Sequence, residues 1–146
     1  MKRLVGAICR LLADSTLRAG LNMPRECLAV YDSTMARFWF FSDKARREIT
    51  SVLRNVPLGR IVPEAELKNL GVCFEDQRYG EMVFLLDPGC MMAHGDFNGP
   101  QWMPAGMHGY HPEDVHSDAI FLSNRPPTQP VRMIADVWRC MDERTA

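Results

Sequence analysis

The sequence predicts an α/β or α+β fold, in which helices pack on a β-sheet. Segments with the helical spacing of apolar residues alternate with short apolar runs that are typical of strands. The chain has 146 residues, of which 47% are hydrophobic, and this composition suits one buried core. The sequence contains neither an internal repeat nor an obvious linker, so residues 1–146 are predicted to form a single domain.

The first predicted helix covers residues 3–18. Leu4, Ile8 and Leu11 recur at the spacing of one helical face. Arg10 interrupts the apolar stretch, which favours an amphipathic helix over a signal peptide. The sequence also lacks the run of about eighteen apolar residues that a membrane-spanning helix needs, so we expect no association with a membrane.

Residues 27–41 are rich in β-branched and aromatic side chains, and they predict one or two strands with a break near Asp32 and Ser33. The aromatic side chains at positions 38–41 are expected to lie in the core. A stacking platform for nucleic-acid bases needs basic surroundings, whereas the formal net charge of this chain is −1. Nucleic acid is therefore not an expected partner.

A second helix is predicted to begin at a cap formed by Ser42 or Asp43 and to end near Pro57 and Gly59. Its apolar side chains recur at helical spacing and are expected to form one buried stripe. The residues of this stripe are Ala45, Ile49, Val52 and Leu53.

A shorter helix is predicted to begin with Pro63 at its first position and to end at Gly71. Leu67 and Leu70 are expected to face the core. The continuously apolar run MVFLL at residues 82–86 then predicts a strand that is covered on both faces.

The last part of the chain begins with a long irregular connection, residues 90–117, of a length that usually serves a function. Residues 118–124 predict a strand, and residues 131–141 predict a terminal helix. The apolar face of that helix is expected to consist of Val131, Ile134, Ala135, Trp138 and Met141.

The five cysteines are widely spaced and include no CxxC pair. This spacing excludes a zinc ribbon and a thioredoxin-type redox motif. We expect free thiols and therefore a reducing compartment, the cytoplasm.

Three of the four histidines lie in the segment GMHGYHPEDVHSD, residues 106–118. Imidazole and carboxylate groups are common zinc ligands, and Gly106 and Gly109 let the backbone bend tightly around His108. His108 is thus a candidate metal ligand, but on residue types alone an ordinary polar loop is the favoured interpretation, because the spacing matches no metal motif that suffices alone. The other candidate donors are His111, Glu113, Asp114, His116 and Asp118, whereas His94 is expected to face solvent.

Three ordered segments resemble the type I phosphodiesterase/nucleotide pyrophosphatase family of the alkaline phosphatase superfamily. GMHGYHPEDVHSDAIFLSN is similar to the HG(Y/F) segment near the C-terminus of that family, and DSTMARFWFF and RYGEMVFLLDPG resemble the region that precedes it. The resemblance spans roughly residues 28–141. It implies that His108 is a ligand to one of two closely spaced metal ions, usually zinc, in a site that hydrolyses phosphate esters.

The resemblance also implies a two-metal mechanism in which a Thr or Ser oxygen attacks phosphorus and water then hydrolyses the phospho-enzyme. The nucleophile, the first aspartate ligand and the Asp-His-Gly motif of the family are absent from this sequence. Thr34 lies in a segment that does not supply the nucleophile, and we interpret it as structural. The family commonly has Asp after the aromatic residue, where this chain has His111.

The chain thus resembles the C-terminal part of such an enzyme, with a partial alkaline-phosphatase-like sheet that is incomplete without an N-terminal half. A catalytic zinc site needs about three protein ligands, so we expect the chain to contribute His108 and to be inactive and weakly zinc-binding alone. Its expected partners are the missing half or another chain, together with a phosphate ester substrate. The alternative is a non-catalytic α/β module that binds a protein partner through a sheet edge or the helix at 3–18.

Overall fold

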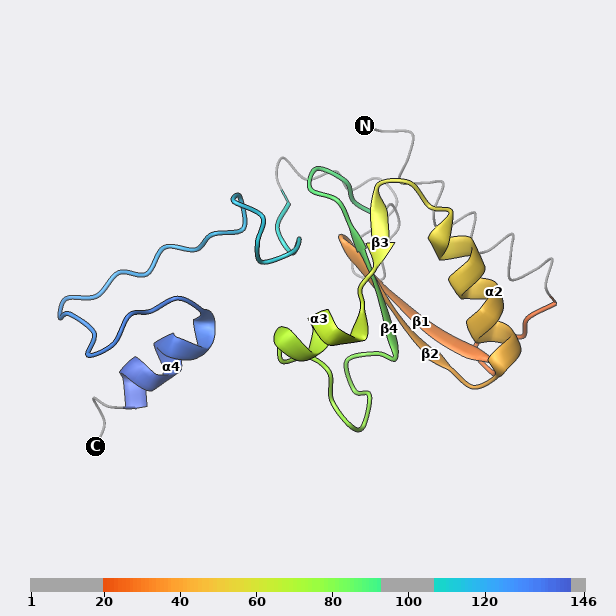
Figure 1. Ribbon diagram of the computed structural model, residues 1–146, viewed down its shortest axis with the longest axis horizontal. Coiled ribbons are helices and arrows are strands. Elements are labelled where there is room, and N and C mark those ends of the chain that lie inside the picture. Colours follow the sequence, from red (N-terminus) through yellow and green to blue (C-terminus); the bar gives the residue numbers. More distant parts are fainter. Residues whose placement is uncertain (1–19, 93–106, 143–146) are drawn as a thin grey trace.

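The computed structural model describes residues 20–92 and 107–142, which form a mixed structure of helices and one four-stranded antiparallel sheet (Figure 1). The strands lie in the order β1-β2-β4-β3. Their bounds are β1 (Cys27–Asp32), β2 (Met35–Phe40), β3 (Gly59–Ile61) and β4 (Met82–Leu86). The helices are α2 (Asp43–Arg54), α3 (Glu64–Asn69) and α4 (Ile134–Asp142). The prediction of a sheet with packed helices is confirmed at this level.

Strands β1 and β2 form a hairpin whose register pairs Cys27 with Phe40 and Asp32 with Met35. The two-residue turn begins at Ser33, whose φ of 45° places it in the left-handed region. The predicted break near Asp32 and Ser33 is therefore confirmed. Within the aromatic run, Phe38 is buried, but Phe41 is 62% exposed, so its prediction as a core residue was wrong.

Helix α2 begins as the sequence predicts, because the Ser42 hydroxyl accepts a hydrogen bond from the Ala45 backbone N–H at 3.2 Å. Ala45, Ile49 and Leu53 are buried against the sheet, and Val52 packs partly buried beside them. Burial of an Ile or Leu side chain stabilises a fold by about 1.5–3 kcal/mol. This stripe therefore fixes α2 on one face of the sheet.

Strand β3 was not predicted, because its three residues follow a turn and present no apolar run. It pairs with β4, and the chain then turns into α3, where Pro63 is the N-cap residue and not the first helical residue that the sequence predicts. Leu67 is buried as expected, whereas Leu70 is 39% exposed, which corrects its prediction as a core residue. Gly71 follows the helix with a φ of 71°, as expected of a helix end.

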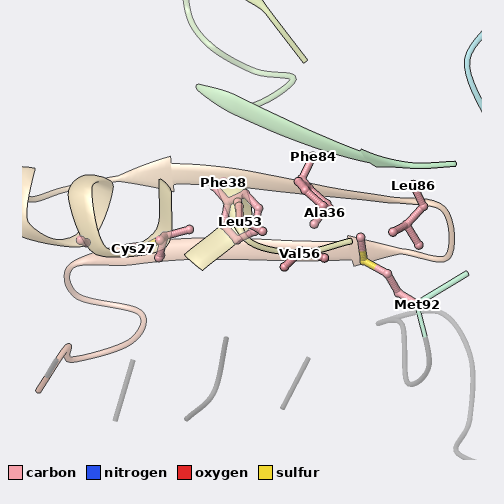
Figure 2. Packing of buried hydrophobic residues seen from close by; sticks show 10 residues of the cluster. Cys27, Ala36, Phe38, Leu53, Val56, Phe84, Leu86 and Met92 are labelled. Carbon is pink, nitrogen blue, oxygen red and sulfur yellow. The ribbon is translucent and has the colours of Figure 1, made fainter. Parts of the chain in front are cut away.

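Strand β4 lies between β2 and β3 and contributes to a core on each side of the sheet. Phe84 and Leu86 belong to the cluster that α2 covers, and Figure 2 shows both side chains within that cluster. Val83 and Leu85 belong to a second cluster, which contains Leu67 of α3. The prediction that this strand is covered on both faces is confirmed.

The last part of the described chain carries apolar side chains that the other described residues do not cover. Residues 118–124 form no strand, contrary to the prediction, and Ile120 and Leu122 are each 87% exposed. Helix α4 begins at Ile134, three residues later than predicted, and contains no buried residue. Figure 1 shows α4 set apart from the sheet at the end of an extended segment.

The helix predicted for residues 3–18 lies outside the described residues, as do His94 and Gly106. Cys27, Cys73, Cys90 and Cys140 are free thiols, as expected. None of the helices in the described part combines the length and the hydrophobicity that crossing a membrane requires.

Candidate functional site

The segment that carries the histidines, residues 107–117 and here called the histidine loop, is fastened to the sheet through its backbone. The Thr34 hydroxyl donates a hydrogen bond of 2.7 Å to the Gly109 carbonyl oxygen, which lies 75 residues further along the chain. Thr34 is only 2% exposed and lies in the turn between β1 and β2. The loop is therefore held at the end of the sheet where β4 also finishes, since Leu85 pairs with Met35 there.

Gly109 is required at this contact for two reasons. Its φ of +93° lies in the region that side chains rarely adopt, and a Cβ atom would lie 3.0 Å from the Thr34 hydroxyl oxygen. The expectation that Gly109 lets the backbone bend next to His108 is confirmed.

A second contact holds the next residue of the loop. The Tyr110 hydroxyl donates a hydrogen bond of 2.8 Å to the Cys90 carbonyl oxygen. Burial raises the pKa of the Tyr110 phenol above its ordinary value. The phenol therefore remains protonated around neutral pH and is available as the donor.

A third contact joins the loop to α3 through a carboxylate. His111 Nε2 lies 2.9 Å from Glu66 Oε1. The two Glu66 oxygens in turn accept hydrogen bonds of 2.8 and 2.6 Å from the guanidinium group of Arg60. The hydrogen bonds and charge of Arg60 lower the pKa of Glu66, with a smaller contribution from His111, so this carboxylate is ionised near neutral pH.

His108, the predicted metal ligand, directly precedes the three residues that make these contacts and is exposed. The described residues contain no group of three or more His, Cys, Asp or Glu side chains that could hold a metal ion. A catalytic zinc site needs about three protein ligands. Within the described chain, His108 would thus contribute a single imidazole to such a site.

The other predicted donors do not gather around His108. Glu113 is 91% exposed in its side chain and reaches only His111, at 3.9 Å from Nδ1. One Asp114 oxygen accepts the backbone N–H of His116 at 3.3 Å, within a tight turn of the loop. His116 and Asp118 are exposed.

Sequence reasoning missed the residues that fasten the loop. Thr34 was interpreted as structural, but nothing in its segment indicated a contact with Gly109. Arg60 and Glu66 appear in the sequence as ordinary charged residues of a turn and a short helix. Their pairing with each other and with His111 depends on how α3 packs on the sheet, and no local pattern carries that information.

Comparison of the chain with protein-family models, with curated proteins and with solved structures yields no match.

Proposed function

We propose that this chain is the C-terminal part of a metal-dependent phosphodiesterase or nucleotide pyrophosphatase that hydrolyses phosphate esters. The observation that carries the proposal is the hydrogen bond between Thr34 and Gly109. Thr34 belongs to DSTMARFWFF and Gly109 to GMHGYHPEDVHSD, two segments on which the resemblance rests. Segments far apart in the sequence that converge at one edge of a sheet are a common arrangement for a site.

In this proposal His108 is the metal ligand that the chain supplies. Its exposed ring belongs to a loop that is held directly after it, by the Thr34 hydroxyl at Gly109 and by the Tyr110 hydroxyl at Cys90. A ligand held in this way needs little reordering when the ion binds. Two divalent ions, zinc in the family, would offset charge on the phosphoryl group. The remaining ligands and the nucleophile would come from outside these residues.

The proposed partner is a missing N-terminal half, supplied either in the same polypeptide or by another chain. Ile120, Leu122 and Ile134 are 87%, 87% and 89% exposed, and burying such apolar side chains against another chain would be favourable. In this view, the sheet is one part of a larger alkaline-phosphatase-like sheet, and the extended segment with α4 packs on the missing half.

The alternative function, a non-catalytic α/β module that binds a protein partner, is favoured by one observation. The apolar face of α4 is exposed, with Trp138 at 66% and Met141 at 64%. A partner with a hydrophobic groove would accept such a helix. This surface differs from the sheet edge and the helix at 3–18 that the sequence suggests.

Hydrolysis of bis-p-nitrophenyl phosphate tests the enzymatic proposal. The chain is produced together with a polypeptide that carries the Asp…Thr and Asp-His-Gly motifs, and the assay is run with and without zinc. We expect zinc-dependent hydrolysis that His108→Ala abolishes and His116→Ala leaves unchanged. Equal activity in the His108→Ala variant would remove this residue from the site.

Sedimentation of the chain at several concentrations tests the alternative. A zinc-independent complex with a partner that has no phosphodiesterase motif, weakened by Trp138→Ala, would favour the binding module. A complex that forms only with the motif-bearing half, and that becomes active on formation, would favour the enzyme.

A further inference from the structure

His111 differs from the other histidines of the loop because one of its ring nitrogens accepts a hydrogen bond and the other lies beside a carboxylate. Nδ1 accepts a hydrogen bond of 3.2 Å from the backbone N–H of Glu113. A nitrogen that accepts this bond carries no proton, and a neutral imidazole has its single proton on the other nitrogen. The geometry therefore places the proton of His111 on Nε2.

Nε2 is buried from solvent and lies 2.9 Å from Glu66 Oε1. Its N–H does not point at that oxygen, so the contact is electrostatic and is not a hydrogen bond. Because both Glu66 oxygens are bound by Arg60, the carboxylate cannot readily turn away from the ring. A donor N–H thus meets an anchored anion across the junction between the histidine loop and α3.

We propose that His111 is a positioning residue, held as the Nε2–H tautomer between the Glu113 amide and the Glu66 carboxylate, and that it fixes the loop that presents His108. In this arrangement the Glu113 amide occupies Nδ1, while Nε2 carries the proton and is buried beside Glu66, so His111 is not a ligand. The part of this inference that concerns presentation of a metal ligand rests on the proposed function. The tautomer and the docking of the loop do not depend on it.

A carboxylate that orients a histidine is a familiar support for metal sites, and its loss typically costs about 10–100-fold in metal affinity or activity. Here the carboxylate acts one step away from the ligand, through a different histidine three residues along the loop. This places the supporting contact in α3, so the position of His108 depends on how that helix packs on the sheet.

Nitrogen NMR of the full chain with ¹⁵N-labelled histidine tests the tautomer in the absence of metal. At a pH near 7.5, above the ordinary histidine pKa, we expect His111 to show one unprotonated nitrogen, Nδ1, and one protonated nitrogen, Nε2. The exposed His116 is the control and should show averaged signals from rapid tautomer exchange. Averaged signals from His111, a proton fixed on its Nδ1, or protons on both of its nitrogens would overturn the assignment.

Hydrogen exchange tests the positioning role. His111→Ala should speed exchange of the Glu113 and Asp114 amides, which bond to His111, roughly tenfold, which is the usual effect of losing one or two polar contacts. His111→Gln, whose amide nitrogen can stand in for Nε2, should restore most of the protection, and His116→Ala should have no effect. Unchanged exchange in His111→Ala, with the core amides of β4 still protected, would overturn the proposal.

The assembled enzyme separates this inference from the proposed function. We expect His111→Ala to weaken zinc binding while activity at saturating zinc stays near wild type, whereas His108→Ala abolishes activity and leaves loop exchange unchanged. If His108→Ala has no effect on activity, the proposed function fails while the tautomer result stands. If His111→Ala leaves zinc affinity unaltered, its role in presenting the ligand fails.

Discussion

The Thr34 hydroxyl and the Gly109 carbonyl, 75 residues apart in the chain, are joined by a hydrogen bond of 2.7 Å. Thr34 is buried in the turn of the β1–β2 hairpin, and Gly109 follows the exposed His108. One hydroxyl therefore connects the most regular part of the fold to the loop with the candidate metal ligand. Removing this hydroxyl should therefore affect both the β1–β2 hairpin and the histidine loop.

Thr34→Val keeps the shape of the side chain and removes its hydroxyl. We expect the free energy of unfolding to fall by about 1 kcal/mol, the net value of a typical hydrogen bond, together with faster exchange of the amides near Gly109. Thr34→Ser retains the donor, so its free energy of unfolding and its amide protection should both fall less. Urea unfolding and hydrogen exchange are measured for both variants. Equal results for Thr34→Val and Thr34→Ser would show that the hydroxyl contributes nothing.

Gly59→Ala should be destabilising because of space and not because of backbone conformation. A Cβ atom at this position would lie 2.7 Å from the Phe84 ring and 2.9 Å from the Leu85 carbonyl oxygen. Overpacking of this kind costs about 1–3 kcal/mol. Gly71→Ala is the contrast, because no atom lies within 4 Å but φ is +71°, so its cost of about 1–2 kcal/mol comes from the backbone alone. Thermal unfolding of both variants and a crystal structure showing a displaced Phe84 only in the first would check this.

Ile49 and Ile134 offer a matched test of whether α4 is covered in the isolated chain. Ile49 is 2% exposed in α2, and Ile134 is 89% exposed in α4. We expect Ile49→Ala to lower the free energy of unfolding by about 2–5 kcal/mol and Ile134→Ala to change it by less than about 0.5 kcal/mol. A large loss on Ile134→Ala in urea unfolding would mean that another part of the chain covers this face.

The pairing of Glu66 with Arg60 and His111 should make part of the stability depend on pH. The pKa of Glu66 is lowered on folding, so its carboxylate stabilises the folded chain above its unfolded pKa, and this contribution is lost as the pH falls through the folded pKa. Glu66→Gln should therefore be less stable than wild type at neutral pH, and the difference should disappear once the pH falls below the lowered pKa of Glu66. Glu48→Gln, on the exposed surface of α2, serves as the control in urea titrations at both pH values.

Cys27 and Cys73 should differ sharply in their reactivity with iodoacetamide. Burial, helped by the negative charge of Glu81, raises the pKa of the Cys27 thiol to about 11, and its side chain is fully buried. The thiolate is the reactive form, so Cys27 should be modified only when the chain unfolds. Cys73 is exposed and should react in the folded state. Peptide mass spectrometry with and without urea measures both, and rapid labelling of Cys27 in the native chain would contradict its burial.

Local patterns anticipated those elements whose burial or capping shows in their own residue types. The MVFLL run identified β4, and Ser42 identified the start of α2, because burial and capping leave their own residue types in the sequence. The run AIFL at 119–122 has the same apolar character but forms no strand. A strand needs a neighbour to pair with, and composition shows only that a segment is able to pair.

The candidate site likewise has features that the sequence predicts and features that it does not. The bend at Gly109 was predictable, because glycine has the conformational freedom that a φ of +93° requires. The contact of His111 with Glu66 was not predictable, since the two residues lie 45 positions apart (111 − 66) and meet only after α3 has packed on the sheet. Histidine content indicated where the polar groups are, and tertiary packing determined which of them have partners.

Strand β4 has apolar side chains on both faces of the sheet. A shift of its register by one residue would therefore place other apolar side chains on each face. Polarity, which normally penalises such a slip, gives little protection here. Packing must specify the register instead. Gly59 has no side chain, which leaves room for the Phe84 ring in the observed register of β3 and β4. A larger residue at position 59 is therefore expected to favour misaligned, aggregation-prone pairings of β4 during folding, in addition to destabilising the native state.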